Sequence, residues 1–577
     1  MKGLAKSSVI VLLIASLLLN GCAKQIDNEK PETTTPPITT TEEAVTTKDP
    51  NIPSFTVAPV DVTTAQTTEA PKSDNTQSNS SGTTQTEATT TQAPITSHED
   101  ITVEDVTNND GKIVDDFLSE MVFDTEDPNE LYDMFGLDRN ERKAYYDKIS
   151  KEHNFPIIHV STENEKEVLS LENYVNCLVE VFNCDSYYQM DAVSGGIRVR
   201  GNASAFYGDV DKIRKNGAPY RIKFTNRQNL LGLNDDALCK SWVLLRTYDT
   251  GVSDYLALKL AAAINQGEYY SSDCAFVQLY INEEYAGIYV LCEQNQVNDE
   301  RVDVYEPEEG YTGTDIGYLV ELDNYGYSEE NKFLLNYNNE KITDVYGTSR
   351  VPRKYYYTVK NDVYSEEQVD FIERYFEIAW EIPMRAIRDG EFYKVGEDKQ
   401  SIVLAQDEFS SAKECIEQIW DIQSVVDMYI THELTNNQDV GGGSFYFAID
   451  FSEGADINKM TCVAPWDFDW AYADYYSDAD GGLYAAKFKD SNFVDRFGDR
   501  TNPWLVLFYS ADWFQDMVKN TWRDRVSDIA DTTAEVRATV ENNTADLNKD
   551  GKKRSGRAKS ILSWVESRIE YLSEIWG

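Results

Sequence analysis

The chain has little of what zinc or nucleic acid would need. Only four of its 577 residues are histidine, and its eight cysteines form no CxxC pair, so a zinc site is not expected. Its 53 lysine and arginine residues are outnumbered by 100 acidic residues, which gives a net charge of −47, and the basic residues form no stripe. Nucleic acid is therefore excluded as an expected partner.

The cysteine pattern also argues against a disulfide framework. Apart from Cys22, seven cysteines are scattered at irregular spacing, most of them inside apolar runs. An odd number of cysteines in such surroundings predicts buried thiols.

A long apolar run is missing as well. Residues 7–19 are uncharged and apolar, follow two lysines, and are too short to span a membrane comfortably, which is typical of a signal peptide. The run ends in Leu-Asn-Gly-Cys, which resembles the bacterial lipobox. We predict that residues 1–22 are a lipoprotein signal peptide and that a lipid on Cys22 anchors the exported protein to the bacterial cell membrane, facing outside. The alternative, an ordinary signal peptide with a free cysteine, predicts release into the medium.

Residues 23–100 have the composition of a tether. They are rich in threonine, proline, serine, glutamine and acidic residues, with few large apolar groups. Such a segment buries too little apolar surface to offset the entropy of ordering, so we expect it to be disordered and to hold a folded part away from the membrane.

The folded part begins near residue 101 and changes character along its length. Residues 101–194 are predicted to form an extension, with a helical pattern over 115–149, followed by the first strands, and residues 195–577 to form the main domain. Alternating apolar strands dominate the first half of this domain and helical spacing the second, including 422–434. An α+β fold with a β-rich N-terminal part and a helical C-terminal part follows; this order is that of a bilobal protein-kinase-like fold, although periodicity alone does not establish it.

Three positions in the β-rich part could meet phosphates. The strand at 195–200 ends in a Gly/Asn/Ser turn, where Arg200 and the backbone around Asn202 could face an anion. The alternative is an ordinary turn, which needs the same residues. Lys223 lies on an alternating strand and could supply the counter-charge of a nucleotide phosphate, or be a solvated strand lysine. Glu293 ends an apolar strand and either marks the edge of a nucleotide pocket or is simply the first exposed residue.

Carboxylates gather in the stretch 431–470. Asp439 lies in a polar, glycine-rich loop after the helix at 422–434, and alternation in WDFDW puts Asp467 and Asp469 on one side and the aromatic residues on the other. Paired carboxylates suit Mg²⁺ or Mn²⁺, and Asp439 would then be free to orient or deprotonate a hydroxyl. The alternative is that all three are solvated turn aspartates.

A calcium loop is not expected near the C-terminus. Residues 546–551 begin like one, but position 12 is Arg557, where a bidentate carboxylate belongs. We predict a turn there, before a last helix over 558–576.

Seven blocks resemble a known family. They occur in the order seen in the CotH kinase family, named for a bacterial spore coat protein, and cover roughly residues 195–472: RVRGNASAF, PYRIKF with LLGL, WVLLRTYD, FVQLYINEEYAGIYVLCE, GYLVELD, NNQD and PWDFDWAY. The resemblance implies an atypical, secreted protein-kinase-like fold that uses ATP and a divalent metal, Mg²⁺ or Mn²⁺, to phosphorylate Ser or Thr of proteins.

The resemblance also implies roles for single residues. Asp439 is similar to the catalytic-loop aspartate, Asp467 to the metal-binding aspartate, and Lys223 to the lysine of the family's KPYRIKF block, our candidate for the nucleotide phosphates. Ser444 stands five positions after Asp439, where kinase loops carry a metal-binding asparagine, and is a poorer ligand.

Two functions follow as hypotheses. The first is a membrane-anchored, ATP-dependent kinase that acts on Ser/Thr-rich surface or coat proteins. The second is a catalytically silent cell-surface module that binds wall polysaccharide or a protein partner through exposed aromatic residues, of which the chain has many.

Overall fold

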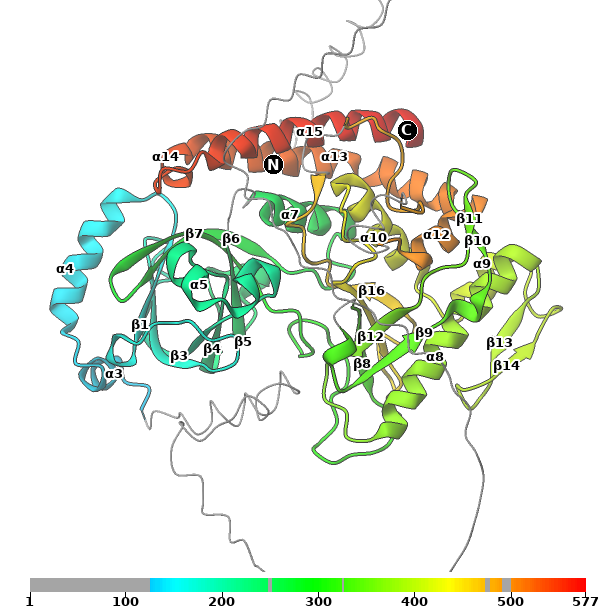
Figure 1. Ribbon diagram of the computed structural model, residues 1–577, viewed down its shortest axis with the longest axis horizontal. Coiled ribbons are helices and arrows are strands. Elements are labelled where there is room, and N and C mark those ends of the chain that lie inside the picture. Colours follow the sequence, from blue (N-terminus) through cyan, green and yellow to red (C-terminus); the bar gives the residue numbers. More distant parts are fainter. Residues whose placement is uncertain (1–124, 247–251, 324–325, 473–477, 490–499) are drawn as a thin grey trace, which may run out of the picture. The chain divides into compact units, whose positions relative to one another are not determined.

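The computed structural model describes residues 125–577 except 247–251, 324–325, 473–477 and 490–499 (Figure 1). The predicted signal peptide with Cys22, the predicted tether, and residues 115–124 of the predicted helical segment lie outside the described residues.

The first half of the described chain forms a closed barrel (Figure 1). Its order is β1-β2-β3-β4-β5-β7-β6, and the strands are β1 (Ile157–Thr162), β2 (Val175–Phe182), β3 (Met190–Val199), β4 (Tyr220–Gln228), β5 (Cys239–Arg246), β6 (Cys274–Ile281) and β7 (Glu284–Glu293). All neighbours are antiparallel except β1 and β6, whose parallel pairing closes the barrel. The barrel thus includes strands on both sides of residue 195, which itself lies within β3.

The alternation expected for β4 is present. Tyr220, Ile222 and Phe224 pack in the barrel core, while Arg221 and Lys223 lie on the opposite face. That face is covered too, so both basic side chains are buried and the solvated reading of Lys223 is wrong.

Two short helices cover one side of the barrel. They are α3 (Pro128–Met134) and α4 (Arg139–Ile149), within the segment expected to be helical. Arg142 of α4 reaches a buried ion pair with Glu180 of β2, which fixes this extension to the barrel.

The second half is not simply helical, which corrects the prediction for the C-terminal part. It contains an antiparallel sheet in the order β16 (Thr461–Val463), β15 (Phe445–Asp450), β8 (Gly317–Leu322), β12 (Tyr355–Val359) and β9 (Lys332–Leu335). Two hairpins add β10 (Ile342–Thr343) with β11 (Ser349–Arg350) and β13 (Tyr393–Val395) with β14 (Ile402–Leu404). The α+β class is confirmed.

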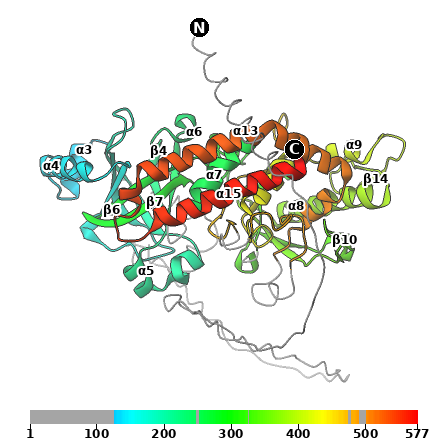
Figure 2. The same cartoon turned by 90° about the horizontal axis from the view of Figure 1, so that it is seen from above.

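The main helices enclose one continuous core with this sheet. They are α7 (Val252–Asn265), α8 (Glu366–Met384), α10 (Ile422–Thr435), α12 (Pro503–Tyr509), α13 (Asp512–Asn542) and α15 (Arg554–Trp576). The shorter ones are α5 (Val210–Asn216), α6 (Leu233–Asp236), α9 (Ala412–Glu417) and α14 (Thr544–Leu547). Figure 2 shows α13 and α15 lying side by side.

The C-terminal elements follow the sequence pattern closely. The last helix begins at Arg554, four residues before the predicted start at 558. Its Ile561, Leu562, Val565 and Leu572 are buried, and Ile575 is exposed. A turn precedes this helix, and its acidic residues have protein partners: Asp546 accepts backbone N–H groups of Asn154 and Phe155, and Asp550 pairs with Arg554.

The seven cysteines from 177 to 462 are free thiols, and six of them are buried, as predicted. Among the described residues, no helix combines the length and the apolar character needed to cross a membrane.

Candidate active site

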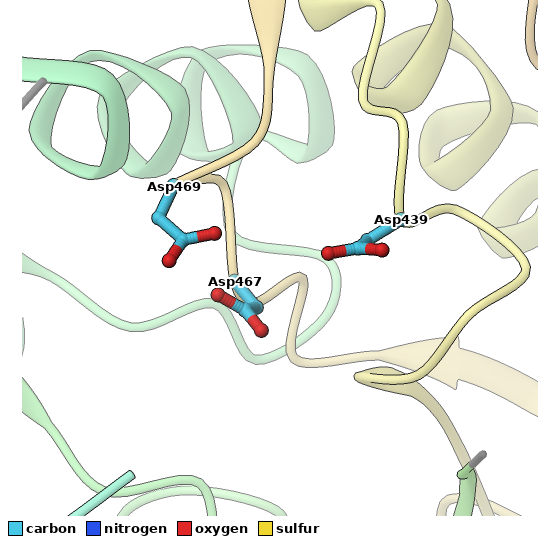
Figure 3. A group of neighbouring side chains, drawn as sticks. All are labelled: Asp439, Asp467 and Asp469. Atoms are coloured by element: carbon cyan, nitrogen blue, oxygen red, sulfur yellow. The ribbon is translucent and has the colours of Figure 1, made fainter. Parts of the chain in front are cut away.

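Three aspartates from two distant segments meet in space. Asp439 comes from the loop after α10, and Asp467 and Asp469 come from the segment after β16 (Figure 3). One carboxylate oxygen of each lies within 4.8 Å of the other two. The structure therefore joins the three carboxylates that the sequence singled out.

The end of α10 positions Asp439. The helix stops at Asn436, which adopts the left-handed conformation (φ 45°), and the chain then turns toward the site. The side chain of the buried Asn437 accepts the N–H of Asp439 (3.0 Å) and donates to the backbone carbonyl of Asp467 (3.2 Å). One amide group thus holds the two loops together.

A bend, not a strand, orients the WDFDW segment. Asp467 has a positive φ of 61°, and β16 has already ended at Val463. Asp467 and Asp469 are exposed, whereas Trp466 and Phe468 are buried. The predicted separation of acidic and aromatic side chains is confirmed, although strand alternation is not its cause.

His432 of α10 lies below this bend as a neutral ring. It stacks on Phe445 and Phe468, with ring centroids 5.5 and 5.6 Å away. Burial lowers the pKa of His432 to about 3, so this imidazole is uncharged near neutral pH.

The negative charges of Asp467 and Asp469 repel one another. The negative charge of Asp467, together with desolvation, raises the pKa of Asp469 well above its usual value. Desolvation by the surrounding protein atoms raises the pKa of Asp467 as well, and the positive charge of Arg200 opposes this shift. A bound cation would offset this repulsion and favour the ionised form of both carboxyl groups.

A fourth acidic residue, Asp254, supports the bend from beneath. It lies in the first turn of α7, is buried, and accepts the N–H of Phe468 (2.9 Å). Burial first, and the charge of Asp467 second, raise the pKa of Asp254 to about 7. Sequence reasoning missed it; the signal was an acidic residue at the start of an otherwise apolar helix.

Two arginines contact the first and last tryptophans of the WDFDW segment, on either side of Asp467 and Asp469 in the sequence. The Arg200 guanidinium lies over the Trp466 ring, 5.6 Å from its centroid, and that of Arg500 over the Trp470 ring at 5.1 Å. Arg200 was predicted as an anion-binding residue and is at the site. Arg500, which forms an ion pair with Asp439, was not predicted.

Ser444 joins the site from the strand side. Its side chain hydrogen-bonds with Asp467 and lowers the pKa of that carboxyl, and its N–H donates to Glu321 (2.8 Å). Glu321 in turn forms an ion pair with the partly buried Lys360 (2.9 Å), which the sequence analysis did not single out. Ser444 is therefore close enough to Asp467 to share a ligand with it.

The remaining predicted residues lie in the barrel. Lys223 of β4 has Gly196 and Ser241 as its cross-strand neighbours, and its role toward phosphate stays a prediction. Asn202 is exposed in the turn after β3.

Glu293 is fully buried, so the reading of it as the first exposed residue is wrong. It forms a buried ion pair with Arg301 (3.3 Å) and accepts the N–H of Asp273. Its role at a nucleotide pocket stays a prediction.

The donor set fits a hard divalent cation. Three carboxylate groups converge, no sulfur or imidazole ligand takes part in this group, and Mg²⁺ and Mn²⁺ prefer oxygen ligands. Bound there, such an ion would offset the charge of a polyphosphate and of the carboxylates themselves.

Part of the chain matches a protein-family model. No curated protein matches the chain. Residues 197–383 match the family model described as CotH kinase protein. The matched range includes Arg200, Asn202, Lys223 and Glu293, and it ends before the three aspartates. The part of the chain that is similar to the CotH kinase family therefore runs from Ile197 in β3 to Pro383 in α8.

Proposed function

We propose that the protein is an exported kinase, anchored to the membrane through Cys22, that transfers the γ-phosphate of ATP to Ser or Thr of surface or coat proteins with Mg²⁺ or Mn²⁺. The observation that carries this proposal is the meeting of Asp439, Asp467 and Asp469 from segments 28 residues apart. The family match to residues 197–383 supports the kinase class.

We assign a role to each residue from the segment on which it lies. Asp467 and Asp469 would hold the metal, with Ser444 beside Asp467. Arg200, whose charge already acts on Asp467, would meet negative charge on the donor side. Asp439, on the separate loop, would accept the proton of the acceptor hydroxyl. A bound metal–ATP complex would supply the phosphoryl group and offset its charge.

Transfer of labelled phosphate tests the proposal. Purified full-length protein with Mn²⁺ or Mg²⁺ and γ-labelled ATP should label itself or a Ser/Thr-rich protein. Asp439→Asn or Asp467→Asn should lower the rate at least about a hundredfold, because each removes a group that acts in the transition state. Asp456→Asn is the matched control, since Asp456 is exposed in the loop between β15 and β16. Labelling no higher than that of the Asp439→Asn, Asp467→Asn double variant would end the proposal.

A further inference from the structure

The three converging aspartates allow two different arrangements. All three oxygens are close enough to bind one ion, yet the proposed chemistry needs Asp439 to face the acceptor hydroxyl. We propose that Arg500 is a positioning residue that holds Asp439 away from the metal and so reserves its carboxylate for the acceptor. This inference rests on the proposed function for the acceptor, but its effect on metal binding can be measured without any catalysis.

The ion pair is built into the protein and is not a surface contact. The side chains of Arg500 and Asp439 are only 14% and 17% exposed, so solvent screens their attraction far less than in an exposed pair. The guanidinium also lies over the ring of Trp470, and this cation–π contact helps to hold Arg500 in place.

The glycine-rich loop explains how Arg500 reaches Asp439. A Cβ added to Gly442 would lie 2.2 Å from Nη1 of Arg500 and 3.0 Å from Oδ1 of Asp439. A Cβ on Gly441 would meet the backbone of Thr501 at 2.3 Å. Because Gly441 and Gly442 have no side chains, residues 500–501 can approach the loop closely enough for Arg500 to reach Asp439.

The positive charge has a predictable consequence for metal affinity. Arg500 neutralises one of three negative charges that would otherwise attract a cation, and it occupies one of three possible ligands. Removing it should strengthen metal binding while weakening transfer. A residue that only supported the fold would weaken both.

Calorimetry with Mn²⁺ alone measures the first effect. Arg500→Gln should bind Mn²⁺ roughly tenfold more tightly than the unsubstituted protein, as expected for the loss of one nearby charge. Arg500→Lys keeps the charge and should remain within about threefold. Thermal unfolding of each variant shows whether it is folded.

A double variant tests whether the tighter binding depends on Asp439. Arg500→Gln combined with Asp439→Asn has the same net charge as the unsubstituted pair and lacks the third carboxylate. Its Mn²⁺ affinity should return to the starting value. If it stays as tight as in Arg500→Gln alone, Asp439 is not the ligand that Arg500 withholds, and the inference is overturned.

Two neighbouring glycines give an independent test that leaves Arg500 in place. Gly442→Ala puts a methyl group against the guanidinium and should raise Mn²⁺ affinity in the same direction as Arg500→Gln. Gly443→Ala is the matched control, because no atom lies within 4 Å of its Cβ. Equal affinities in Gly442→Ala and Gly443→Ala would contradict the inference.

The two proposals fail in different ways. If Arg500→Gln binds Mn²⁺ no more tightly, or more weakly, the positioning role of Arg500 is wrong even when transfer is observed. If Mn²⁺ affinity rises as expected but no variant transfers phosphate, the metal arrangement stands and the kinase proposal fails.

Discussion

At the scale of single residues, the site depends on side chains that hold its aspartates in position. Asn437 is the clearest case, because its side-chain amide both accepts and donates a hydrogen bond within the site. Its oxygen accepts the N–H of Asp439, and its nitrogen donates to the carbonyl of Asp467. The relative position of the two carboxylates therefore depends on one buried amide.

Substitution of Asn437 tests this link. Asn437→Ala removes two partly buried hydrogen bonds, to the N–H of Asp439 and to the carbonyl of Asp467, so we expect a loss of about 1–3 kcal/mol in the free energy of unfolding. Mn²⁺ affinity should fall as well, because Asp467 loses its orientation. Asn437→Asp can still accept from Asp439 but cannot donate to Asp467. Equal Mn²⁺ affinity in Asn437→Ala and the unsubstituted protein, measured by calorimetry, would show that Asn437 does not position the carboxylates.

The sequence predicted the three converging aspartates, Arg200 and Ser444, but not Asp254 or Arg500. Asp467 and Asp469 stand in a conspicuous motif, and Asp439 follows a helix end. Arg500 and Asp254 reach the same place through tertiary packing. Nothing in its own segment marks Arg500, and the local sign of Asp254 is an acidic residue at the start of an otherwise apolar helix. Local pattern identifies such residues only when several of them share one segment.

At the scale of elements, α10 carries the site on a nearly fully buried helix. Every residue from Ser424 to Thr435 is buried. One of them, Asp427, is a carboxyl group whose Oδ1 accepts from Gln423 (2.8 Å). Burial raises the pKa of Asp427 to about 7, the largest cause being desolvation.

This buried carboxyl predicts a pH-dependent stability. The folded protein holds a proton on Asp427 up to about pH 7, whereas the unfolded chain releases it near its ordinary pKa of 3.8. The contribution of this group is therefore complete at low pH and is lost as the pH rises toward 7, by about 2 kcal/mol between pH 5 and pH 7.

Denaturant unfolding of Asp427→Asn checks the expectation. The amide does not titrate, so the variant should gain stability relative to the unsubstituted protein as the pH rises from 5 to 7. A difference between the two proteins that stays constant over this range would contradict the assigned pKa.

Individual strands and helices were largely predictable, and the barrel was not. The runs at β4, β6 and β7 show the alternation or apolar character of strands, and Ser365 and Gln368 form a capping box at the start of α8. Closure requires β1 to pair in parallel with β6, more than a hundred residues later. Such a pairing depends on register between distant segments, which local pattern does not contain.

At the scale of the whole described chain, its last helix is tied to the site. Arg568 of α15 forms a buried ion pair with Glu433, near the end of α10. Glu433 also accepts the N–H groups of Tyr484 (2.7 Å) and Ala485 (2.8 Å), and Arg568 donates to the carbonyls of Ala479 and Gly482. One ion pair therefore joins α15, α10 and residues 479–485.

Removing one partner of this pair should be costly. Arg568→Met leaves Glu433 buried without its counter-charge, and we expect a loss of about 3–5 kcal/mol in the free energy of unfolding. Adding Glu433→Gln should restore part of the loss. Lys559→Met, an exposed position on the same helix, should change it by less than about 0.5 kcal/mol. A loss in Arg568→Met as small as that of Lys559→Met would show that the buried pair does not hold these elements together.

The most direct test of the account is to locate the metal. Crystals of the protein grown with Mn²⁺ and a non-hydrolysable ATP analogue would show the ion by its anomalous scattering. We predict one or more peaks within ligand distance of Asp467 and Asp469, with the triphosphate on the side of Arg200. Strong Mn²⁺ peaks elsewhere and none between these two carboxylates would contradict the claim that Asp467 and Asp469 hold the metal of a metal–nucleotide site.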